Sequence, residues 1–120
     1  MAIWIRRVAI LGFWGLAFII GFLSLLPAEN LPDVRIWDKI EHLIAYGALA
    51  MCGLIAYPSH AFKVIAATIA YGIAVEFGQG LVPGRDPSFG DVIANSLGAV
   101  IAALVVRLAP VQRLFPSSTT

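Results

Sequence analysis

The stretch at residues 71–95, YGIAVEFGQGLVPGRDPSFGDVIAN, decides the fold, because one apolar segment ends within it and a second begins. A single carboxyl residue, Glu76, interrupts the first segment, and Asp91 lies near the start of the second. A Pro-Gly pair and Arg85 separate them. A charged group at the centre of a bilayer costs from ~2.5 to more than ~10 kcal/mol, and less near its edge. These polar residues are therefore the first candidates for a functional site.

The composition is that of a membrane protein. The chain has 120 residues, of which 60% are hydrophobic and only 12% are charged, whereas soluble domains have about 25% charged residues. We expect a single domain over residues 1–120. The net charge of +1 and the absence of a basic run argue against a nucleic-acid partner. Cys52 is the only cysteine, so no disulfide forms within one chain, and we expect a buried, inert thiol.

Four apolar segments predict four transmembrane helices, at residues 8–26, 38–57, 64–82 and 89–108. Each approaches the ~20 residues that cross ~30 Å of hydrocarbon. A cleaved signal peptide is the alternative interpretation of the first segment, but that segment is longer than the usual apolar core of ~7–15 residues. The prediction is an all-α integral membrane four-helix bundle.

Lysine and arginine residues divide unevenly between the two ends of such a bundle. With four spans, five of them lie on the side of both termini and three on the other side. Because short cytoplasmic loops are enriched in Lys and Arg, we expect a bacterial inner-membrane protein with both termini in the cytoplasm. All seven acidic residues belong to the other, outer half. The five are Arg6, Arg7, Lys63, Arg107 and Arg113, and the three are Arg35, Lys39 and Arg85.

Polar residues and glycines recur at helical spacing on three of the four segments, which places each group on one helix face. Charged and polar residues inside a membrane usually face the bundle interior. We therefore predict a polar pocket at the outer ends of helices two to four, with Arg85 as the partner that neutralises Glu76. The three faces are Asp38, His42 and Tyr46; Gly72, Glu76 and Gln79; and Asp91, Asn95 and Gly98.

The same residues form four motifs that resemble the VanZ-like family of small bacterial membrane proteins, over residues 38–103. The resemblance implies a cell-envelope protein associated with resistance to the glycopeptide teicoplanin, and it implies no particular reaction. Ala102 departs from the pattern, since a second glycine is expected there. The motifs are Asp38-Lys39-x-x-His42-x-x-x-Tyr46, Tyr71-Gly72-x-x-x-Glu76-x-x-Gln79, Pro83-Gly84-Arg85 and Asp91-x-x-x-Asn95-x-x-Gly98.

Several of these residues also have a purely structural interpretation. Asp38-x-x-Glu41 and Ser88-x-x-Asp91 have the spacing of capping boxes, which satisfy free N–H groups at a helix start. His42 and Asn95 are suited to hydrogen bonds between helices, and Tyr46 to packing. Glu76 lies too far inside its segment for a cap or a loop to explain it, so it is the strongest candidate for a functional residue.

The favoured interpretation is a non-enzymatic protein that binds or modulates a membrane lipid, a lipid-linked wall precursor or a glycopeptide. Two alternatives remain open: a membrane enzyme acting on a lipid or polyprenyl headgroup with His42 as general base, and a dimeric, proton-coupled transporter that uses Glu76. We expect no resident cofactor or metal, although a divalent cation bridging the outer acids is compatible with the sequence. The candidate ligand-binding residues are Asp38, Lys39, His42, Tyr46, Glu76, Gln79, Arg85, Asp91 and Asn95.

Overall fold

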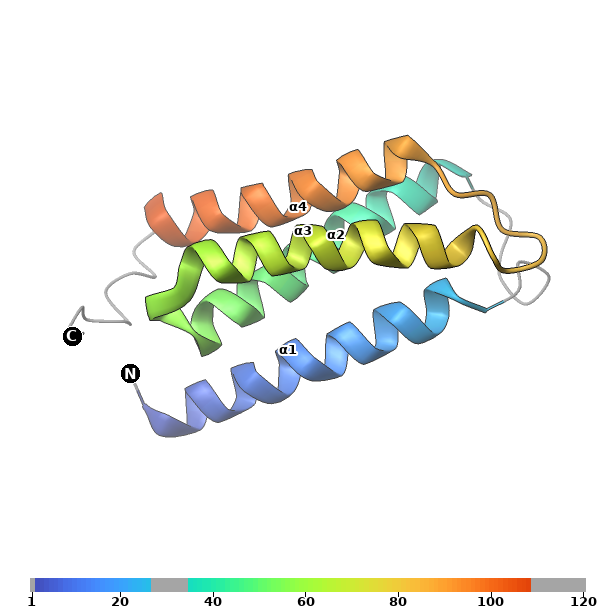
Figure 1. Cartoon of the computed structure of the whole chain (residues 1–120). Helices are drawn as coiled ribbons and strands as arrows, with labels where there is room; N and C mark the ends of the chain where they lie inside the picture. Colours follow the sequence, from blue (N-terminus) through green and yellow to red (C-terminus); the bar gives the residue numbers. More distant parts are fainter. Residues whose placement is uncertain (1, 27–34, 109–120) are drawn as a thin grey trace.

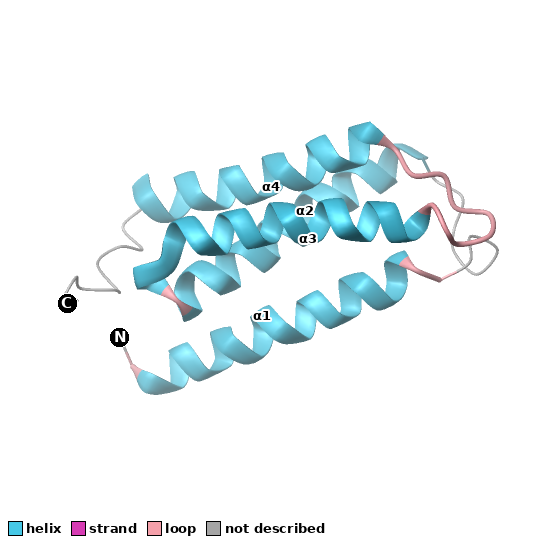
Figure 2. Cartoon of the chain, viewed as in Figure 1, coloured by secondary structure: helices cyan, strands magenta, loops and turns pink. Residues whose placement is uncertain are grey.

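Four helices make up the fold (Figure 2). The computed structural model describes residues 2–26 and 35–108, with side chains in the second range described from residue 39 onward. The helices are α1 (Ile3–Ser24), α2 (Arg35–Ala56), α3 (Ala61–Gln79) and α4 (Phe89–Leu108), and a short 3₁₀ helix, η2 (Pro58–His60), joins α2 to α3. The described ranges contain no strand. The prediction of an all-α bundle is confirmed.

The four helices run antiparallel in succession (Figure 1). The start of α1 and the end of α4 lie at one end of the bundle, and the α3–α4 loop lies at the other. Helix α2 is central, with its most extensive contact to α4, whereas α1 packs on α2 and slightly on α3. All four helices are long and apolar enough to cross a membrane. The protein is therefore a multi-pass membrane protein.

Helix α3 ends at Gln79, three residues earlier than the apolar segment predicted. The backbone N–H of Gly80 donates to the carbonyls of Glu76 and Phe77, which closes the last turn. The chain then reverses through Gly84, whose φ of 78° lies in the left-handed region that glycine adopts without strain. Leu81 and Val82, which follow Gly80, are apolar but belong to the loop, because hydrophobicity alone does not fix where a helix stops.

Close packing of α2 on α4 depends on glycine. A Cβ added to Gly98 would collide with the carbonyl oxygen of Leu43 and lie 2.9 Å from the backbone nitrogen of Gly47. Ala102, where a second glycine was expected, is almost fully buried against the same helix pair. Ala102 therefore belongs to the buried core that α2, α3 and α4 share.

Large apolar side chains cover much of the outer surface, as expected where lipid replaces water. On α1, Leu11 and Phe18 are each 73% exposed, and Leu81 in the α3–α4 loop is 88% exposed. Cys52 is half-buried, and its Sγ would lie 3.2 Å from a Cβ on Gly12 of α1. The thiol therefore lies beside α1 and is less buried than the sequence predicted.

Candidate functional site

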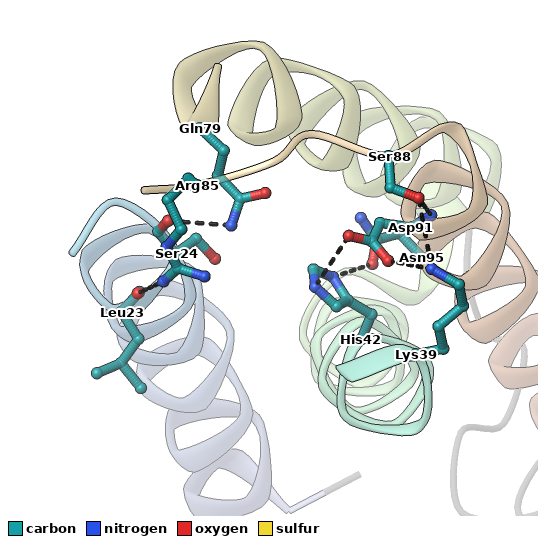
Figure 3. A network of polar contacts seen from close by, with 9 residues as sticks. All are labelled: Leu23, Ser24, Lys39, His42, Gln79, Arg85, Ser88, Asp91 and Asn95. Carbon is teal, nitrogen blue, oxygen red and sulfur yellow. Dashed lines mark hydrogen bonds and ion pairs between the residues drawn. The ribbon is translucent and has the colours of Figure 1, made fainter. Parts of the chain in front are cut away.

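Four side chains from α2 and α4 form a polar cluster near the end of the bundle where both helices begin (Figure 3). The Nζ of Lys39 lies 2.8 Å from Oδ1 of Asp91. His42 Nδ1 lies 2.8 Å from Oδ1 of Asn95, and its Nε2 lies 3.8 Å from Oδ2 of Asp91. We call Lys39, His42, Asp91 and Asn95 the polar cluster. The predicted convergence of the α2 and α4 faces is confirmed.

Helical spacing explains why these four residues meet. Asp91 and Asn95 lie one turn apart on α4, and Lys39 and His42 lie three residues apart on α2, so each pair shares a helix face. Asn95 is only 2% exposed and Asp91 only 9% exposed. Buried polar groups are costly unless they are hydrogen-bonded, and here each finds its partner on the opposite helix. The cluster thereby joins α2 to α4.

Ser88 completes the start of α4. Its Oγ accepts a hydrogen bond from the backbone N–H of Asp91 at 3.4 Å, so the predicted cap at Ser88 is confirmed. The same oxygen lies 3.4 Å from Nζ of Lys39. For the other proposed cap, the side chain of Asp38 lies outside the described residues, and Glu41 is exposed.

Tyr46 lies one turn deeper than His42, and the two rings stack with centroids 6.3 Å apart at 9°. The tyrosine is 1% exposed and belongs to a buried cluster with Ile20 and Leu49. Its hydroxyl has no hydrogen-bond partner among the described residues. A Cβ on Gly72 would come within 3.1 Å of the Tyr46 ring. Tyr46 therefore packs against α3 at Gly72.

Glu76 lies one turn above Gly72 on the same face of α3 and is 6% exposed. Its Oε1 is buried and has no hydrogen-bond partner within the described part of the chain. No described cation lies within ion-pair distance of its carboxyl group. Lys39, His42 and Asp91 act on it at longer range, and the backbone N–H of Ser88 acts on the carboxyl group as a hydrogen-bond donor.

Arg85 does not neutralise Glu76, so that prediction was wrong. Its guanidinium donates to the backbone carbonyls of Leu26 and Leu23, each at 2.7 Å. Gln79 donates in the same way to the carbonyl of Ser24, at 3.0 Å. The last carbonyls of a helix have no partner within it, and the final turn of α1 contains no basic residue. Arg85 supplies the positive charge that favours such a helix end.

The predicted pocket of helices two to four therefore divides into two parts, which Figure 3 shows side by side. Gln79 and Arg85 tie the end of α3 and the following loop to α1, whereas the polar cluster joins α2 to α4. Tyr71 adds to the first part, because its hydroxyl donates to the carbonyl of Ala17 on α1. The ligand-binding candidates from the sequence are thus not all in one place.

A pocket of about 280 Å³ lies where α3 ends and α4 begins. We call it the junction pocket. Glu76 and Ser88 supply its charged and polar side chains, and apolar residues make up most of the rest. It is lined by Ile73, Glu76, Phe77, Gly80, Pro87, Ser88, Phe89 and Val92.

Sequence reasoning missed the second contact of Ser88, the bond of Tyr71 to α1, and the apolar lining of the junction pocket. Ser88 was visible only as a cap, because nothing in the sequence sets the distance from it to Lys39. Phe77 and Phe89 look like ordinary lipid-facing residues of a membrane helix. Nothing in the sequence indicates that these two rings line the same pocket.

The arrangement provides a paired anion and cation, a histidine between two acceptors, and one buried acid beside an apolar pocket. Among the side chains that the structure describes, at residues 2–26 and 39–108, no three His, Cys, Asp or Glu residues lie close enough together to hold a metal ion.

Comparison with known proteins gives one match. A family model described as VanZ/LLP1 matches residues 4–110, which is nearly the whole chain. No curated protein and no solved structure matches.

Proposed function

The chain belongs to the VanZ/LLP1 family, and from that premise we propose that it is a non-enzymatic membrane protein of the bacterial cell envelope. In this proposal it binds or modulates a membrane lipid or a lipid-linked wall component, and thereby alters susceptibility to the glycopeptide teicoplanin. The link to glycopeptides rests on the family, and the binding role rests on the site.

The single observation that carries the binding role is Glu76. Its carboxyl group is buried beside the junction pocket, and its Oε1 has no partner in the described structure. A buried charge without a partner is strongly destabilising, at ~3–5 kcal/mol when one half of a buried pair is removed. Arg85 and Gln79 bond to the carbonyls of α1, whereas Glu76 keeps an open oxygen at Oε1 beside the pocket. In our proposal this oxygen is the contact point of a ligand.

The distribution of charge supports a site that faces outward. Arg6, Arg7, Lys63 and Arg107 lie at the end of the bundle that contains the start of α1, whereas Lys39 and Arg85 lie near the other end. Lys and Arg are enriched on the cytoplasmic side of short-looped membrane proteins. We therefore assign the chain to the inner membrane with its termini in the cytoplasm and the polar cluster toward the wall.

Drug susceptibility in a strain that lacks the protein tests this proposal. Cells that express the wild-type chain should differ in teicoplanin susceptibility from cells with an empty vector. Asp91→Asn removes the charge that holds Lys39 and should return susceptibility to the empty-vector level. Glu41→Gln, which neutralises an exposed acid on α2, is the matched control and should behave as wild type. Membrane abundance of each variant is measured by immunoblot.

If cells that express the wild-type chain have the same teicoplanin susceptibility as cells with the empty vector, the proposed role in the envelope is contradicted. If Asp91→Asn and Glu41→Gln change susceptibility equally at equal abundance, the role in the envelope does not depend on the polar cluster.

One observation favours a membrane hydrolase as the second candidate. Ser88 Oγ lies 3.4 Å from Lys39 Nζ, and serine with lysine is a known variant of nucleophile and base. The same Nζ, however, donates to Asp91 at 2.8 Å, which suits a hydrogen-bond donor better than a base. Release of product from a radiolabelled envelope lipid extract by wild type, lost in Ser88→Ala and in His42→Ala, would favour the enzyme.

A further inference from the structure

The junction pocket combines a lipid-facing rim with a buried acid. Phe77 and Phe89 line it from two different helices and are 75% and 79% exposed, so both rings lie on the outer surface of the bundle. Glu76 lines the same pocket but is 6% exposed. A molecule in this pocket therefore contacts apolar surface and can reach the Glu76 carboxyl group.

The charges around the pocket do not balance. Lys39 and Asp91 pair with each other at 2.8 Å, and His42 lies between Asp91 and Asn95. Glu76 is left with no cation within ion-pair distance in the described structure. A second acid, Asp91, acts on it electrostatically. The pocket therefore favours a cation and disfavours an anion.

The pocket also lies at the right depth for a lipid headgroup. Glu76 is three residues before the end of α3 at Gln79, which is about 4.5 Å along the helix axis. The facing wall begins at Ser88 and Phe89, at the very start of α4. Both walls thus lie close to the membrane–water boundary, where headgroups are found.

From this geometry we infer that the junction pocket binds a bilayer phospholipid with a primary-amine headgroup, such as phosphatidylethanolamine. The ammonium group donates to the Glu76 carboxylate, and the apolar part of the lipid next to its headgroup lies along Phe77 and Phe89. An ammonium has three N–H donors, so it satisfies the buried oxygen that the protein leaves unpartnered. This inference rests on the proposed function, because it names the ligand class of the same site.

Other headgroups fit less well for stated reasons. Phosphatidylglycerol is anionic and would face Glu76 and Asp91 together. Phosphatidylcholine is zwitterionic, with the same net charge as phosphatidylethanolamine, but its quaternary nitrogen has no N–H to donate. The comparison of these three lipids therefore separates hydrogen bonding from charge alone.

Native mass spectrometry of the purified full-length chain tests the inference. The protein in detergent is loaded with phosphatidylethanolamine, phosphatidylcholine and phosphatidylglycerol of identical acyl chains, and the retained lipid is counted. We expect phosphatidylethanolamine to be retained about tenfold more strongly than either of the others, the low end for a charge-assisted hydrogen bond. Equal retention of the three lipids, or retention of none, would overturn the inference.

Variants locate the preference within the chain. Glu76→Gln should remove the tenfold preference, whereas Glu41→Gln should retain it, because Glu41 is exposed on α2 and does not line the pocket. A preference that persists in Glu76→Gln would place the lipid elsewhere and overturn the inference. The wild-type comparison needs no variant, so it stands even if Glu76→Gln does not fold.

The two proposals fail separately. Loss of the drug phenotype in Asp91→Asn with no lipid preference in the wild type would leave the proposed function intact and refute the ligand. A clear preference for phosphatidylethanolamine in a protein without any drug phenotype would support the ligand and refute the proposed role in drug susceptibility.

Discussion

At the scale of single residues, Glu76 and Arg85 show how far the sequence could go. An acid inside an apolar helix marks itself in any hydropathy pattern, so Glu76 was predictable. The partner of Arg85 was not, because its long side chain starts from a loop whose path no periodicity fixes. The loop carries it to the open carbonyls of α1 and away from Glu76.

The role of Arg85 gives a prediction about stability. Arg85→Ala removes two hydrogen bonds to α1 and should lower the free energy of unfolding in detergent by ~1–2 kcal/mol, allowing for partial exposure. Lys63→Ala, at an exposed site on α3, is the control and should change it little. Because Arg85 does not pair with Glu76, the effects of Arg85→Ala and Glu76→Gln should add within about 0.5 kcal/mol. A coupling energy much larger than that would indicate an ion pair between Arg85 and Glu76, contrary to the contacts of Arg85 with α1.

At the scale of helices, the meeting of α2 and α4 was predictable from spacing, and its closeness was not. Polar residues four apart on two neighbouring segments indicated that His42 and Asn95 face each other. Residue spacing does not indicate how closely the two backbones approach, because that distance depends on the crossing point of the two helices. Gly98 marks that point, where no side chain fits.

Cysteine cross-linking tests this convergence directly. In a Cys52→Ala background, His42→Cys and Asn95→Cys should cross-link in membranes with a short bifunctional reagent, since the native side chains lie 2.8 Å apart. The single variants His42→Cys and Asn95→Cys serve as controls for links between chains. A folded double variant that never cross-links would contradict the packing of α2 on α4.

Glycine substitutions test the closeness of the same contact. Gly98→Ala places a methyl group against the backbone of Leu43 and Gly47, and overpacking of this kind costs roughly 1–3 kcal/mol. Gly15→Ala on α1 is the matched control, because nothing lies within 4 Å of its added Cβ. The free energy of unfolding of that variant should be unchanged or rise by up to about 1 kcal/mol, because alanine has a higher helix propensity than glycine. Equal unfolding free energies for the two variants would refute the close approach.

At the scale of the whole molecule, four spans followed from length and composition alone, because ~20 apolar residues are what a bilayer requires. The ends of the helices shifted by a few residues. Arg6, expected before the first span, lies within α1 and donates from Nε to the carbonyl of Ala56 at 3.0 Å. A long basic side chain can belong to a membrane helix when its charged head reaches the boundary, so the charge did not mark where the helix starts.

Orientation is the prediction that belongs to this scale. A reporter enzyme active only in the cytoplasm, fused after Thr120, should be active, because Lys and Arg are more numerous on the side of the termini. A fusion after Pro83, in the α3–α4 loop, is the control and should be inactive. Activity of a periplasm-only reporter after Thr120 would reverse the bundle and turn the polar cluster toward the cytoplasm.

The central claim is that Glu76 is a binding residue and not a brace, and Glu76→Gln tests it most directly. The measurement is thermal stability in detergent taken together with teicoplanin susceptibility, with Glu41→Gln as control. A neutral amide of similar volume removes the cost of a buried charge, so the account predicts equal or higher stability together with loss of the drug phenotype. A collapse of stability, with the phenotype falling only in proportion to the folded protein, would contradict it.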